Sequence, residues 1–98
     1  MSIQLKKLSL DAVSRAVLFD AVAALRQVQP KEMHGIYDVT LASIDAASDR
    51  IMLTEAQAGI VRCAIARWNE VQGATPDTVR MLDQLTLTRK QYTEKYPD

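Results

Sequence analysis

The chain of 98 residues carries twelve basic and twelve acidic side chains; 48% of it is hydrophobic and only 5% aromatic. These values exclude a disordered or fibrous protein, and the balanced charge gives no long-range attraction to nucleic acid or to an anionic membrane. The single cysteine excludes an internal disulfide and suits a reducing cytoplasm.

The first eight residues hold two lysines and no long apolar run, so we expect neither a signal peptide nor a membrane span. Ile3, Leu5 and Leu8 are compatible with a short strand, a frayed helical turn or an arm, and we treat this segment as irregular.

A first helix is predicted over residues 10–28, with Ser9 as its N-cap and Pro30 as its stop signal. Its buried face recurs at helical spacing and comprises Leu10, Val13, Val17, Leu18, Ala21, Val22, Leu25 and Val28. Phe19 projects from the opposite side, beside Arg15 and Arg26. Because large exposed apolar side chains usually mark a contact, Phe19 indicates either a subunit contact or an error in the helical register.

Three more helices are predicted, over residues 31–49, 55–72 and 76–94. The second has an apolar stripe formed by Met33, Ile36, Tyr37, Thr40, Leu41, Ile44, Ala47 and Ile51. A capping box, Thr54 with Gln57, starts the third helix, Gly73 ends it, and Trp68 lies on its core face. Thr75 and Pro76 start the fourth. With no strand pattern elsewhere, we predict a single all-α domain, a compact bundle of about four antiparallel helices.

No catalytic or metal constellation stands out. His34 and Cys63 are the only residues of their types, and Asp38 follows His34 by one helical turn. Metal sites usually need three or four ligands, so we interpret His34 as a surface residue and Cys63 as an inert boundary residue. The three glycines are far apart and form no phosphate loop. We therefore predict no enzyme activity, no cofactor and no metal.

Three acids of the second predicted helix, Asp38, Asp45 and Asp49, fall on one side of it. They form either a solvated face or a docking face for a basic partner.

The segments Leu53–Gln57 and Thr75–Arg80 resemble the opening and the recognition-helix start of some helix-turn-helix regulators. The resemblance is confined to these two patches. One long helix is predicted between them, where those regulators need a break, and the basic residues do not cluster.

Arg89 falls inside the apolar arc of the fourth predicted helix, which contains Leu85, Tyr92 and Tyr96. The guanidinium could reach water along its own stem, pair with an acid of another helix, or lie on an overhanging helix end that faces a partner. Tyrosine and arginine are enriched at binding hot spots.

We therefore expect a cytoplasmic protein-protein interaction module, namely an adaptor, an inhibitor or an assembly factor, of the kind found as accessory proteins in bacteria and phages. The expected partner is another protein, with a homodimer as one form, and no nucleic acid or membrane. The predicted binding residues are Arg15, Phe19, Arg26, Leu85, Arg89, Tyr92 and Tyr96. The alternative is a nucleic-acid-associated transcriptional regulator with a degenerate helix-turn-helix.

Overall fold

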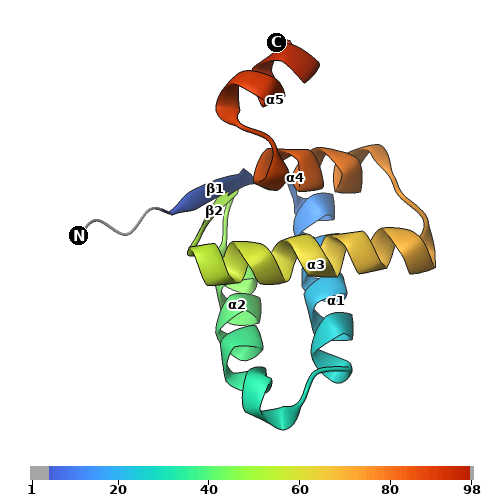
Figure 1. Ribbon diagram of the computed structural model, residues 1–98. Coiled ribbons are helices and arrows are strands. Elements are labelled where there is room, and N and C mark those ends of the chain that lie inside the picture. Colours follow the sequence, from blue (N-terminus) through green and yellow to red (C-terminus); the bar gives the residue numbers. More distant parts are fainter. Residues whose placement is uncertain (1–4, 98) are drawn as a thin grey trace.

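The computed structural model describes residues 5–97, which form five α-helices, one short 3-10 helix and a two-stranded sheet (Figure 1). In chain order the elements are β1 (Lys6–Ser9), α1 (Ala12–Gln27), η1 (Lys31–Met33), α2 (His34–Ala46), β2 (Arg50–Leu53), α3 (Glu55–Gln72), α4 (Pro76–Thr86) and α5 (Arg89–Lys95). The predicted all-α, bundle-like fold is confirmed; the small sheet and the fifth helix were not predicted.

The helices pack around α3, which crosses in front of α1 and α2 (Figure 1). The helices α1 and α2 lie side by side and are joined by the turn around Pro30 and η1. A short connection after α3 leads into α4, which packs on α3 and on β1. The last helix, α5, rises from the end of α4 and projects away from the other helices (Figure 1).

The sheet joins the start of the described chain to the segment after α2. Strands β1 and β2 are antiparallel, with Leu8 opposite Ile51 and Lys6 opposite Leu53. Leu8, Ile51 and Leu53 are buried, while Met52 points outward, which is the alternation of a half-buried strand. Of the alternatives left open for the first residues, the short strand is the one observed at residues 6–9, and treating them as irregular is wrong there. The prediction that no strand lies elsewhere is wrong for residues 50–53. The prediction for Ile3 lies outside the described residues.

The second predicted helix is too long at its C-terminal end. It ends at Ala46, and Ala47 is extended, with ψ of 144°. Arg15 explains part of this stop, because its guanidinium donates hydrogen bonds to the carbonyl oxygens of Ala47 and Ser48. Ile51 misled the prediction because it follows Ile44 by seven residues, a spacing that also fits a helix.

Helix starts follow the capping signals closely. Thr54 and Gln57 form the predicted capping box of α3, and Thr75 caps α4 with Pro76 as its first residue. The cap of α1 is a correction: Asp11, not Ser9, accepts the hydrogen bond from Ser14 N, at 2.7 Å.

One core lies between the sheet and helices α1 to α4. Its buried hydrophobic residues are Leu8, Leu10, Leu18, Ala21, Val22, Leu25, Tyr37, Ile44, Ile51, Leu53, Ala58, Val61, Ala64, Ile65, Met81 and Leu85. Val13 and Val28, which were predicted to lie on the buried face of the first helix, are exposed.

Candidate functional site

The predicted surface around Phe19 is turned toward α2. The Nε and Nη2 atoms of Arg26 lie 2.7 and 3.3 Å from the carboxylate oxygens of Asp38. Arg15 bonds to the chain just after α2, as described above. Phe19 is half-buried and packs against the core, so its predicted position opposite the buried face is wrong. Its role in binding a partner stays a prediction, although much of this face already serves to join α1 to α2.

Of the three acids predicted to share one helix side, only Asp38 and Asp45 lie on α2. Asp38 pairs with Arg26, and Asp45 is exposed beside Phe19. Asp49 lies beyond the end of α2, where its backbone oxygen accepts a hydrogen bond from Leu10 N at 2.8 Å. The prediction of a common face is therefore wrong for Asp49, because the helix that would have placed it there ends at Ala46.

The second predicted surface is divided by a bend in the chain. Leu85 is only 1% exposed and belongs to the core, so its prediction as a partner-facing residue is wrong. The fourth predicted helix ends at Thr86 instead of 94. A new capping box of Thr88 with Gln91 then starts α5, whose first residue is Arg89. Arg89 is exposed at the start of this separate helix, so its guanidinium reaches water, whereas its role in binding a partner stays a prediction.

One carboxylate joins α5 to α4. Asp83 Oδ2 lies 2.5 Å from Lys95 Nζ and 2.6 Å from Tyr96 Oη, and both groups donate to it. The hydrogen bond from Lys95 holds the pKa of Asp83 below its ordinary value of 3.8, with help from Tyr96. The same contact raises the pKa of Lys95 above 10.5 and that of Tyr96 above 10.0. The ring centroids of Tyr92 and Tyr96 lie 4.7 Å apart, with the two ring planes tilted by 38°.

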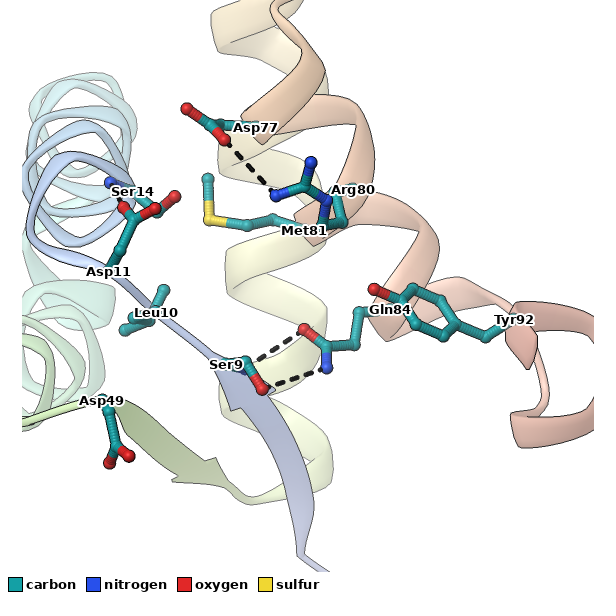
Figure 2. A pocket seen from close by; sticks show the side chains of 10 residues that line it. All are labelled: Ser9, Leu10, Asp11, Ser14, Asp49, Asp77, Arg80, Met81, Gln84 and Tyr92. Carbon is teal, nitrogen blue, oxygen red and sulfur yellow. Dashed lines mark hydrogen bonds and ion pairs between the residues drawn. The ribbon is translucent and has the colours of Figure 1, made fainter. Parts of the chain in front are cut away.

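A groove of about 440 Å³ lies between the start of α1 and α4 (Figure 2). We refer to it as the α1/α4 groove; it is lined by Ser9, Leu10, Asp11, Ser14, Asp49, Asp77, Arg80, Met81, Gln84 and Tyr92. Arg80 Nη1 lies 3.6 Å from Asp77 Oδ1. The amide of Gln84 accepts from Ser9 N at 3.1 Å and donates to Ser9 Oγ at 3.4 Å. Gln84 thus satisfies the backbone N–H and the hydroxyl of Ser9, the last residue of β1.

Of the remaining chemistry-bearing side chains, His34 and Cys63 lie apart from this groove, whereas Asp11 lines it. His34 Nε2 is 3.0 Å from Gln29 O, and Cys63 is exposed on α3. The hydrogen bonds from Ser14 lower the pKa of Asp11, which lines the groove as the cap of α1. Within residues 5–97, no three His, Cys, Asp or Glu side chains converge as a metal site would require.

A second hollow, of about 80 Å³, lies where α3 crosses α1, and sequence reasoning missed it. We call this the α1/α3 surface and define it by Ala24, Arg67, Trp68 and Val71. Val71 is 68% exposed, although it was predicted to face the core; Trp68 is half-buried and packs against the core, as predicted. Arg67 Nη1 lies 3.5 Å from Ala24 O across the hollow. The helical spacing of Trp68 and Val71 was the only sequence signal for this surface. That spacing does not show how far along α3 the packing against α1 extends.

The helices of residues 5–97 include none with the length and apolar character needed to cross a bilayer. Comparison with protein-family models, with curated proteins and with solved structures finds no match to this chain.

Proposed function

We propose that this chain is a small, non-enzymatic protein-protein interaction module that binds its partner through the α1/α3 surface. The observation that carries the proposal is Val71, an aliphatic side chain 68% exposed next to a half-buried tryptophan. Tryptophan and arginine dominate binding hot spots, and Trp68 and Arg67 both line this hollow. The other lining side chains here are mostly small or apolar, so a partner would desolvate few charges.

The length of α3 explains why this surface has no cover within the described chain. Its 18 residues extend about 27 Å, so that after crossing α2 and α1 its C-terminal end continues beyond α1 (Figure 1). The apolar stripe therefore continues past α1, and Val71 lies on the last turn. Fully burying a valine side chain stabilises a complex by about 1.5–3 kcal/mol before the costs of association.

The hollow itself is smaller than a stable interface, which buries about 800 Å² on each partner. We propose that it forms the centre of a larger contact. Val28, the C-cap residue of α1, would extend the contact, because it follows Ala24 by four residues and is also exposed. A second copy of the chain is the simplest partner, since a two-fold dimer would bring the same surface of each subunit together. Adaptor, inhibitor and assembly factor are the roles that such a surface serves, and the single thiol Cys63 suits the cytoplasm.

The test compares Val71→Asp with Val39→Asp. Val39 is 57% exposed on α2 and is therefore a matched control on another helix. Sedimentation equilibrium over a range of concentrations should show a dimer for the unmodified chain and for Val39→Asp, but a monomer for Val71→Asp. If the unmodified chain is monomeric, capture from the native cell should recover a protein with Val39→Asp as bait and lose it with Val71→Asp. Equal behaviour of the two variants in both assays refutes the proposal.

The same protein preparations test the alternative function, a nucleic-acid-associated transcriptional regulator. Binding to duplex DNA or RNA at low salt, lost steeply as salt rises, would indicate contacts with several phosphates and would favour the regulator. The α3 helix is continuous from Glu55 to Gln72, and Arg80 at the start of α4 pairs with Asp77. Neither feature favours that alternative, so we expect no such binding.

A further inference from the structure

The connection between α4 and α5 has the properties of a hinge. Thr86 ends α4, and Leu87 and Thr88 are extended, with ψ of 150° and 161°. Residues 82–96 contain no glycine or proline, so no helix-breaking residue forces the bend. The Thr88–Gln91 capping box stabilises the new helix start, and Leu85 O accepts from Lys6 Nζ and Arg62 Nη1, both at 3.4 Å. The bend therefore depends on weak polar contacts.

Asp83 provides the polar anchor of α5. No residue of α5 is fully buried, and the half-buried Tyr92 and Tyr96 are its most covered side chains. Within residues 5–97, the side-chain hydrogen bonds that join 89–97 to α4 both end on Asp83 Oδ2, from Lys95 and Tyr96. One carboxylate thus acts as a latch for the whole helix.

The position that the latch maintains places Tyr92 on the α1/α4 groove. Tyr92 is the only lining residue of the groove that comes from α5, and its ring points toward Gln84 (Figure 2). Gln84 is the residue bound to Ser9 at the edge of β1. The arm therefore covers the end of the groove where α4 meets β1.

We propose that α5 is a hinged arm that closes one end of the α1/α4 groove, held there by the Asp83 latch, and that it swings away about Leu87–Thr88 when the latch opens. The open arm removes Tyr92 from the groove and uncovers Gln84 on α4. This inference does not depend on the α1/α3 surface, which lies elsewhere on the molecule, on α1 and α3.

The single native thiol makes the arm measurable. Cys63 is exposed on α3, and Glu94→Cys adds a second exposed thiol on α5. Spin labels on the two thiols report the distance from α3 to the arm by double electron–electron resonance. We expect one narrow distance distribution when Asp83 is present, and a shifted, broader distribution in Asp83→Ala. Asp77→Ala is the matched control, because Asp77 also forms an ion pair on α4 but does not contact α5.

Proteolysis gives a second measurement on the unlabelled chain. Trypsin cleavage after Arg89 and Lys90 should accelerate about threefold to tenfold in Asp83→Ala, which is the effect of losing the net contribution of one typical hydrogen bond. If Asp83→Ala disturbs folding, the double variant Lys95→Ala, Tyr96→Phe removes both donors from a helix without buried residues. The proposal is overturned if a latch variant that still folds gives the same distance distribution and the same cleavage rate as Asp77→Ala.

Discussion

Arg26 and Asp38 join α1 to α2 through paired hydrogen bonds of 2.7 and 3.3 Å. Both side chains are partly exposed, so the pair stabilises the fold by at most about 1 kcal/mol. Its importance is geometric, because it shows that this side of α1 faces α2. Phe19 precedes Arg26 by seven residues, two helical turns, and therefore lies on the same side.

Substitution of Phe19 should destabilise the chain. Phe19 is half-buried against the core, and we expect Phe19→Ala to lower the free energy of unfolding by about 1–3 kcal/mol, less than for a fully buried phenylalanine. Denaturant unfolding followed by circular dichroism measures this change. Val13→Ala on the same helix is the control, since Val13 is 64% exposed, and it should change stability by at most about 0.5 kcal/mol. If both substitutions change the free energy of unfolding equally, Phe19 is not a core residue and the prediction of a subunit contact is favoured.

Leu85 tests whether the second predicted surface includes a core residue. Because its side chain is 1% exposed in the core, Leu85→Ala should cost about 3 kcal/mol through lost burial and a cavity. Leu5→Ala provides the same chemical change at a side chain that is 48% exposed, and it should cost less than about 1 kcal/mol. The ratio of the two losses, from denaturant midpoints with unchanged slopes, distinguishes a core leucine from a binding residue.

Local signals predicted most of the fold, and tertiary contacts decided the rest. The starts of α3 and α4 follow from Thr54, Gln57, Thr75 and Pro76, because caps act within one helical turn. The end of α2 depends on Arg15, which lies more than thirty residues away in sequence. The β1–β2 sheet is equally non-local, and strands of four residues are too short to show periodicity.

The candidate sites were harder to predict than the helices. A helical wheel gives the direction of Val71 or Leu85 but not what lies against it, so an exposed stripe and a buried stripe look alike. Asp83 had no sequence signal as a latch, because its partners Lys95 and Tyr96 follow it by twelve and thirteen residues. A continuous helix would carry those partners about 18 Å away, so only the bend at Leu87 brings them together.

Two glycines should respond in opposite directions to the same substitution. Gly35 lies within α2 and has nothing within 4 Å of an added Cβ, so Gly35→Ala should stabilise the chain by about 0.5–1 kcal/mol. Gly73 also has open space, but its φ of +93° is strained for any other residue. Gly73→Ala should therefore destabilise the end of α3 by about 1–3 kcal/mol. Thermal unfolding of the two variants measures both changes, and a stabilising Gly73→Ala would show that the connection relaxes freely.

The latch between Asp83 and α5 should have a defined pH range. The pKa of Asp83 is lowered by its hydrogen bonds, so its contribution is complete above 3.8, the ordinary value, and is lost as pH falls through the lower folded-state pKa. The pKa values of Lys95 and Tyr96 are raised, so their contributions are complete below about pH 10 and are lost as pH rises through the higher folded-state values. The titratable side chains that shift the pKa of Asp83 are Lys95 and Tyr96. Ultraviolet titration of tyrosinate should therefore show the Tyr96 pKa moving back toward 10.0 in Asp83→Ala, with Tyr96→Phe identifying its share of the signal. An unchanged titration would mean that the carboxylate does not bind the phenol in solution, and that α5 is held by contacts other than the latch.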